Sequence, residues 1–135
     1  MPGTGPTLHD TVGPAFFVDL VDRFYDSVEG DPVLISLYPD GADTAAARER
    51  LAMFLAQYWG GPHEYTEKRG HPMLRARHNQ WVIGPQERDR WLLHMLAALE
   101  QSVAALALDQ AVKDDVLGQV ATYMVNAAGH LRNAD

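Results

Sequence analysis

The chain has 135 residues, 47% of them hydrophobic, and its 11 Lys and Arg against 18 Asp and Glu give a formal net charge of −7. This length is typical of one domain, so residues 1–135 are expected to fold around a single core. The acidic balance disfavours a nucleic-acid partner, which would need a concentrated basic surface. The chain contains no cysteine, which excludes disulfides and thiolate ligands.

No stretch of the sequence is typical of a targeting or membrane segment. Met1 to Val12 lack the basic region and apolar run of a signal peptide. No segment approaches the roughly 20 apolar residues that cross a bilayer. We therefore expect a cytoplasmic protein without a membrane partner.

The first third of the chain predicts a loose arm, a long helix and a short one. Residues 1–10 are rich in proline and glycine and are expected to form a loose arm or at most one short helical turn. Gly13-Pro14 opens a helix whose apolar residues recur at helical spacing: Phe17, Leu20, Val21, Phe24, Tyr25 and Val28. Asp31-Pro32 starts a short helix that ends near Tyr38-Pro39.

The middle of the chain predicts another helix and then a loop. Asp43 or Thr44 can cap this helix, and Gly60-Gly61-Pro62 ends it. Its apolar positions are Ala47, Leu51, Phe54, Leu55 and Tyr58. His63 to Met73 shows no sustained period and is expected to be a loop, and a short helix is expected around Leu74 to Asn79.

The last third predicts two further long helices. Gly84-Pro85 with Glu87 starts the first, whose inward face would be Trp91, Met95, Ala98 and Ser102. The second runs from about Asp109 to Leu131, with one face formed by Val112, Val116, Val120, Tyr123, Ala127 and Leu131. Because alternating strand patterns and repeats are absent from the sequence, the predicted fold class is all-α with about four substantial helices.

Histidine spacing disfavours a non-haem metal centre. No pair has the His-x-x-x-His or Glu-x-x-His spacing that places two ligands on one helix face. His9, His63 and His130 are expected in a tail, a loop and a last helical turn, and His94 on a helix rim. Such positions usually hold solvated or structural histidines.

His78 differs from these histidines by its neighbours. Between Lys68 and His78 there are four cations and no carboxylate: Lys68, Arg69, Arg75 and Arg77. Such a cluster in an acidic protein suggests an anionic ligand, although solvated loop charges would give the same pattern. Apolar Leu74, Trp81, Val82 and Ile83 lie nearby in the sequence. An apolar pocket, one imidazole and flanking cations are what a haem and its propionates need.

Three aromatic residues with polar tips are candidates for the opposite side of such a pocket. Tyr25, Tyr38 and Trp91 are each placed by periodicity on an inward face or at a helix end. They could simply be core residues bonded to backbone carbonyls. If they face one space, their donors would stabilise the partial negative charge of a bound diatomic ligand.

Six motifs between Phe16 and Leu131 carry a family resemblance. They are Arg23-Phe-Tyr25, Leu37-Tyr-Pro39, Arg50-Leu-Ala-Met-Phe-Leu-Ala-Gln-Tyr-Trp-Gly-Gly-Pro62, Arg69-Gly-His-Pro72, Leu74-Arg-Ala-Arg-His78 and Glu87-Arg-Asp-Arg-Trp91. With them the sequence resembles the group II truncated haemoglobins of bacteria and plants, and Tyr38 resembles their actinobacterial subgroup. The resemblance implies a truncated globin fold, a two-over-two helical sandwich around a haem. Val12-Gly13-Pro14 departs from the family's first glycine pair.

The resemblance also implies roles for individual residues. His78 would be the proximal iron ligand, and Tyr25, Tyr38 and Trp91 the distal residues that stabilise the ligand. Ala47 falls where other globins carry a distal histidine, which implies a small gate residue. The residues expected to bind the cofactor are His78, Arg50, Leu51, Phe54, Leu74, Arg77, Trp81, Ile83 and Met95.

The function that these residues favour is reversible binding of dioxygen, NO and CO by a haem b protein with slow ligand release. One alternative is a haem enzyme with peroxidase-like or nitric oxide dioxygenase activity, which would need a reductase that the sequence does not identify. Another is a cofactor-free helical interaction module. The family includes dimers and higher assemblies, which leaves a homo-oligomer open.

Overall fold

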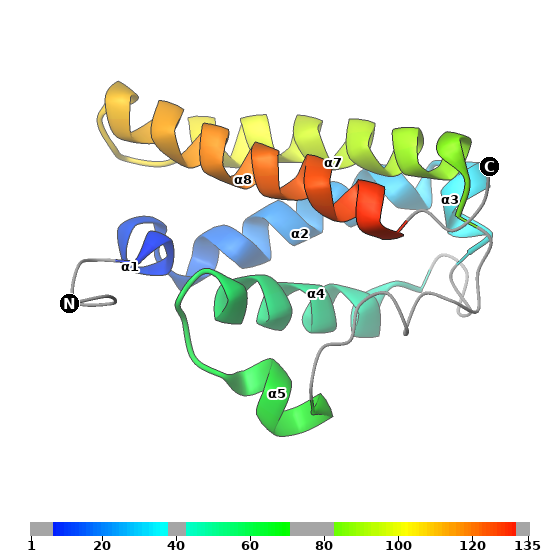
Figure 1. The fold of residues 1–135 in the computed structure, drawn as a ribbon, viewed down its shortest axis with the longest axis horizontal. Helices are drawn as coiled ribbons and strands as arrows, with labels where there is room; N and C mark the ends of the chain where they lie inside the picture. The colour runs from blue at the N-terminus through cyan, green and yellow to red at the C-terminus, as the bar shows by residue number, and fades with distance from the viewer. Residues whose placement is uncertain (1–6, 38–42, 71–82, 132–135) are drawn as a thin grey trace.

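The structure is a computed structural model, described for residues 7–37, 43–70 and 83–131 (Figure 1). These residues form helices and no strand, which confirms the all-α prediction. In the part of the chain that is described, no helix is both long and apolar enough to cross a bilayer. The helices are α1 (Leu8–Val12), α2 (Pro14–Glu29), α3 (Pro32–Ile35), α4 (Ala45–Tyr58), α5 (Glu64–Arg69), α7 (Pro85–Ala104) and α8 (Gln110–Leu131).

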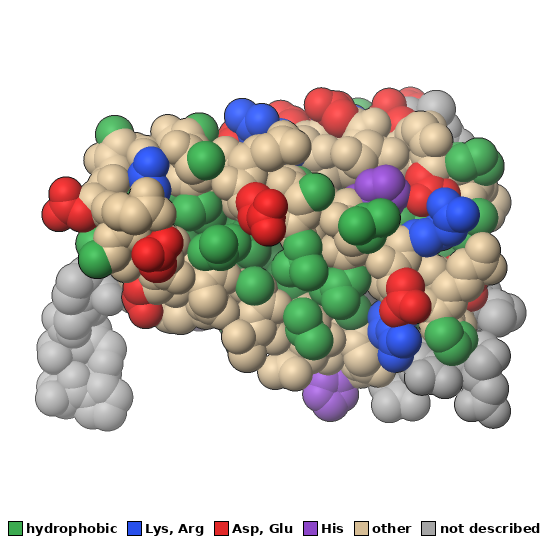
Figure 2. Space-filling model, turned by 90° about the horizontal axis from the view of Figure 1, so that it is seen from above, with side chains coloured by type: hydrophobic (Ala, Val, Ile, Leu, Met, Phe, Trp, Pro, Cys, Tyr) green, Lys and Arg blue, Asp and Glu red, His purple; other side chains and the backbone are tan. Residues whose placement is uncertain are grey.

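The four long helices form two antiparallel pairs. α2 runs against α4, and α7 runs against α8 (Figure 1). α2 also packs against α7, so it joins α4 to the pair formed by α7 and α8. Seen from above, the surface carries scattered acidic and basic side chains around apolar ones (Figure 2).

α2 supplies the centre of the core. Gly13, with a φ of +83°, ends α1 and precedes Pro14, which occupies the first position of α2. All six predicted inward residues of α2 are buried, and Phe16 is buried with them. Their spacing gives one apolar stripe that both α4 and α7 contact.

α7 and α8 bury faces close to those predicted. Of the inward face expected on α7, Met95, Ala98 and Ser102 are buried and Trp91 is half-buried, with Leu99 and Val103 added. On α8, Val112 is exposed, and Met124 and Ala128 are buried in place of Tyr123 and Ala127. The buried row Val116, Val120, Met124 and Ala128 advances by four residues at each step.

The prediction of a loop from His63 to Met73 is wrong for Glu64–Arg69, which form α5. Six residues are too few to show a helical period in the sequence, and contacts with α4 stabilise the helix. Gln57 Oε1 accepts from the Thr66 N–H at 3.0 Å, and Gln57 Nε2 donates to Thr66 Oγ1 at 2.7 Å. Tyr65 is buried against the ring of Phe54. The short helix expected at 74–79 lies outside the described residues.

The glycine pair after α4 allows α1 to approach closely. Residues 8–10, assigned from the sequence to a loose arm or at most one helical turn, begin α1, and Thr7 caps that helix. The His9 N–H donates to the Trp59 carbonyl at 3.0 Å. A Cβ atom built on Gly61 would lie 2.6 Å from His9 Cδ2 and 2.8 Å from the Ala56 carbonyl oxygen. The predicted helix stop is therefore also a docking point for α1.

We expect Gly61→Ala to destabilise the protein by about 1 to 3 kcal/mol, because the added methyl group overlaps His9 and backbone. Gly118→Ala is the control, since a Cβ there meets nothing within 4 Å; it should stabilise α8 by roughly 0.5 to 1 kcal/mol. Denaturant unfolding of both variants measures these changes. Equal stability of the two variants would contradict the proposed close contact between α1 and Gly61.

Candidate functional site

Tyr25 and Trp91, two of the three predicted distal residues, both contact one phenylalanine. The Phe24 ring centroid is 4.9 Å from that of Tyr25 and 5.5 Å from that of Trp91, and both contacts are T-shaped. Tyr25 is 5% exposed, and Phe24 is fully buried. The structure thus brings the polar-tipped residues of α2 and α7 to one place. Tyr38 lies outside the described residues.

The apolar candidates that the structure describes come from α4, from α7 and from the segment just before α7. Phe54 and Ile83 are buried, Met95 is fully buried, and Leu51 is half-buried against the core. Phe54 contacts the rings of Tyr58 and Tyr65 at 6.2 and 5.6 Å between centroids. Leu74, Arg77, Trp81 and the predicted iron ligand His78 lie outside the described residues.

Two members of the predicted cation set have a described environment. Lys68 lies 4.0 Å from Glu49, and both side chains are largely exposed, so this pair stabilises the fold little. Arg50 is half-buried on α4 and forms no ion pair with another described residue. No described residue therefore neutralises the Arg50 charge, which is available to pair with an anionic ligand.

Asp31 joins α3 to α7 beside Trp91. Its Oδ1 caps α3 by accepting from the Val33 and Leu34 N–H groups at 3.0 and 3.3 Å. Arg90 Nη1 donates to both carboxylate oxygens at 3.1 Å, and His94 Nε2 lies 2.8 Å from Oδ2. Burial alone would raise the pKa of this carboxyl group, but the hydrogen bonds from His94, Arg90 and the backbone outweigh it and lower the pKa to about 2.

The Asp31 contacts were not predicted as part of the site. The sequence indicated Asp31 only as a helix cap, and His94 only as a structural rim residue. Arg90 and His94 lie one residue before and three residues after Trp91 on α7, so their bonds to Asp31 help to fix that part of α7. This places a buried carboxylate among the groups that position Trp91.

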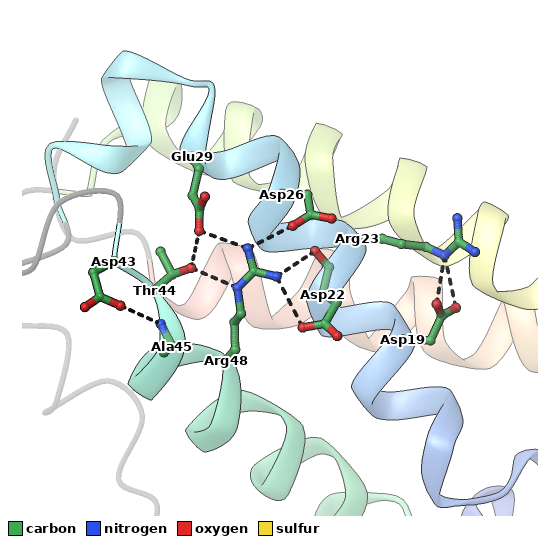
Figure 3. A network of polar contacts seen from close by, with 9 residues as sticks. All are labelled: Asp19, Asp22, Arg23, Asp26, Glu29, Asp43, Thr44, Ala45 and Arg48. Carbon is green, nitrogen blue, oxygen red and sulfur yellow. Dashed lines mark hydrogen bonds and ion pairs between the residues drawn. The ribbon is translucent and has the colours of Figure 1, made fainter.

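Arg48 forms a second polar connection, between α4 and α2 (Figure 3). Its Nη2 donates to Asp26 Oδ1 and to Glu29 Oε2, each at 2.9 Å. Its Nη1 donates to the carboxylate and the carbonyl of Asp22, each at 3.2 Å. Burial by itself would lower the pKa of the guanidinium, but the bonds to Glu29, Asp26 and Asp22 outweigh it and raise the pKa. The periodicity of α4 gave no sign of this residue's role.

The three other histidines that the structure describes occupy varied positions. His9, expected in a solvated tail, stacks on Phe17 at 5.8 Å between centroids, and its Nε2 is buried. His63 precedes α5 and is exposed, and His130 is exposed in the last turn of α8. These three histidines come from separate parts of the fold.

Comparison with known proteins assigns these features to a family. Residues 7–126 match the bacterial-like globin family. The group 2 truncated hemoglobin YjbI of Bacillus subtilis is 35% identical over 87% of each chain. The hemoglobin of Thermobifida fusca is 45% identical, with a TM-score of 0.84 over 94% of this chain and 97% of that one. The group II 2-on-2 hemoglobin of Agrobacterium tumefaciens is 30% identical, with a TM-score of 0.83 over the whole of both chains. The expected two-over-two fold is thereby confirmed.

The Asp31 contacts predict acid sensitivity. Because the folded-state pKa of Asp31 is about 2, below its ordinary value of 3.8, the ionised carboxylate stabilises the fold above about pH 4. That contribution disappears as the pH falls through 2. Asp31→Asn should therefore lower stability at pH 7 by about 1 to 3 kcal/mol and flatten the loss of stability between pH 4 and 2.

Thermal unfolding followed by circular dichroism across this pH range measures the effect. Asp89→Asn is the control, since this carboxylate is exposed and pairs only with its neighbour Arg88 among the described residues. If Asp31→Asn matches Asp89→Asn at every pH, the buried contacts do not contribute as described.

Proposed function

The chain belongs to the bacterial-like globin family and is a group II truncated haemoglobin, and from that premise we propose that it binds dioxygen and other diatomic gases reversibly on haem b and releases them slowly. Family membership by itself makes it a haem-based gas-binding protein. The observation that carries the finer proposal is that Tyr25 and Trp91 both contact Phe24. Two side chains with hydrogen-bond donors meet there at the packed junction of α2 and α7.

The described residues fit a haem. Leu51 and Phe54 offer apolar side chains from α4, and Ile83 offers one from the segment before α7, while Met95 of α7 is fully buried in the core. A macrocycle that is largely apolar gains by leaving water for such surroundings. Arg50 supplies a cation for a propionate, and Arg77 is proposed as a second one. His78 is proposed as the protein's bond to iron, with Leu74 and Trp81 beside it.

When bound, haem supplies the iron at which a diatomic gas binds. The chain's part is to hold donors in a dry space: the Tyr25 hydroxyl and the Trp91 indole N–H would donate to the partial negative charge of the gas. Tyr38 is proposed as a third donor. Ala47, half-buried on α4, has no donor group, so it would leave stabilisation to these aromatics. Each bond must break before the gas escapes, which slows release.

His78→Ala should lose stable haem incorporation, because the variant removes the proposed bond to iron. The haem content per chain, measured by the pyridine haemochrome assay, tests this and also identifies the haem as type b. His63→Ala, at an exposed position before α5, should keep the wild-type content. An unchanged haem content and visible spectrum in His78→Ala would overturn the ligand assignment.

Trp91→Phe should raise the oxygen dissociation rate about five- to thirtyfold, since one donor bond of roughly 1 to 2 kcal/mol is lost. Stopped-flow displacement of oxygen by carbon monoxide measures the rate. Trp59→Phe is the matched control, because Trp59 packs on Tyr58 and Tyr123 at the end of α4, and its rate should stay at the wild-type value. Equal rates for wild type and Trp91→Phe would show that Trp91 does not donate to the gas.

A further inference from the structure

We propose that Arg48 is a positioning residue for the distal site: its guanidinium holds the ring of Tyr25 and strengthens the Tyr25 hydroxyl as a hydrogen-bond donor to the bound gas. This inference rests on the proposed function and deepens it. It assigns a role in ligand binding to a residue whose sequence position suggests only a surface charge.

The first support is the placement of the cation over the ring. Arg48 Cζ lies 5.8 Å from the centroid of the Tyr25 ring, within the range in which a cation is attracted to an aromatic face. Tyr25 is buried, and the Arg48 side chain is only 21% exposed. Because water screens this contact little, the attraction is stronger than at an open surface.

The second support is that the guanidinium is held in place by all of its donors. An arginine side chain has five N–H groups. Nε donates to Thr44 Oγ1 at 2.9 Å, two bonds from Nη1 reach Asp22, and two bonds from Nη2 reach Asp26 and Glu29. Thr44 Oγ1 in turn donates to Glu29, so the oxygen atoms around the cation are themselves connected (Figure 3). A side chain fixed in this way keeps its charge over the ring.

The third support is the pattern of charge on α2. Asp22, Asp26 and Glu29 are spaced i, i+4 and i+7, which puts three carboxylates on one helix face. Tyr25 lies within this run of α2. Arg48 is the cation that these carboxylates share in the described structure, and it reaches them from α4. The same contact therefore joins the two helices and brings positive charge to the ring of Tyr25.

The expected consequence is electrostatic. A positive charge on the face of a phenol draws electron density from the ring and makes the hydroxyl proton a better donor to a partly negative acceptor. Without Arg48, the bond from Tyr25 to the gas should weaken. The oxygen dissociation rate should rise by about two- to fivefold, which is less than expected for complete loss of one donor bond because the bond is weakened and not removed.

The test uses the haem-loaded protein and carbon monoxide as a probe. The C–O stretching frequency in the ferrous carbon monoxide form rises when donors to the ligand weaken, and it is independent of turnover. Arg48→Gln should raise this frequency and the oxygen dissociation rate. The matched control is Arg23→Gln, which makes the same charge change at a residue that pairs with Asp19 of α2; it should leave both values at wild type.

A double-mutant cycle with Tyr25→Phe separates an action through Tyr25 from a purely structural one. Tyr25→Phe alone should raise the frequency, and adding Arg48→Gln should then cause no further rise. An equal rise with and without the Tyr25 hydroxyl would overturn the inference, because Arg48 would then act only by holding α4 to α2. No shift in Arg48→Gln, together with a shift in Tyr25→Phe, would also overturn it while leaving the proposed function standing.

Two further results complete the test. If Tyr25→Phe itself leaves the frequency and the dissociation rate unchanged, the proposed distal role of Tyr25 fails, and the inference fails with it. If Arg48→Gln does not fold, Arg48→Lys replaces it in the same experiment. Lysine keeps the charge but cannot form the five hydrogen bonds that hold it over the ring. Any rise in the frequency of Arg48→Lys should then require the Tyr25 hydroxyl, and an equal rise in Arg48→Lys with and without Tyr25→Phe would overturn the inference.

Discussion

The packing of Phe24 is the contact on which the described site depends. Its ring is fully buried in α2, the helix that lies against both α4 and α7. Tyr25 and Trp91 both contact this ring in T-shaped geometry. Because core side chains are packed at crystal-like density, the position of this ring restricts how far α7 can move from α2. The distance between the two proposed donors is therefore set mainly by hydrophobic packing.

Two polar connections complement this apolar contact. Arg48 ties α4 to the acidic face of α2, and Asp31 ties α3 to α7 next to Trp91. In both, one partly or fully buried charge has several hydrogen bonds, which offsets the cost of removing it from water. The exposed pairs Arg23–Asp19 and Lys68–Glu49 lack this enclosure and contribute less to the fold. The region around Tyr25 and Trp91 is thus held together by an aromatic core contact and by two charged connections.

Much of this fold could be predicted because the decisive signals are local. Proline after glycine at Pro14 and Pro85 sets two helix starts, and the Gly60-Gly61-Pro62 stop follows from backbone preferences alone. The inward stripe of α2 follows from its helical period. α5 was missed because a six-residue helix shows no period, and contacts with Gln57 and Phe54 stabilise it instead.

The site was predicted less completely than the fold. Tyr25 and Trp91 were predicted as distal residues from their residue types and inward positions, and in the structure both contact Phe24. Arg48 and the Asp31–Arg90 pair were missed because their bonds join residues 19 to 59 positions apart, and a charged residue on a helix looks the same in sequence whether it is paired or solvated. The roles of all these site residues stay predictions, and Tyr38, Leu74, Arg77, His78 and Trp81 also lie outside the described part of the chain.

Titration of the apoprotein with haem tests the central claim most directly. The absorbance of the Soret band and the quenching of tryptophan fluorescence would be followed together, because Trp91 is proposed to lie beside the cofactor. We predict that both signals saturate at one haem per chain and that the Soret band moves to the position of a histidine-ligated haem. A spectrum that stays that of free haem, without a break at one equivalent, would contradict the assignment of this chain's site to haem.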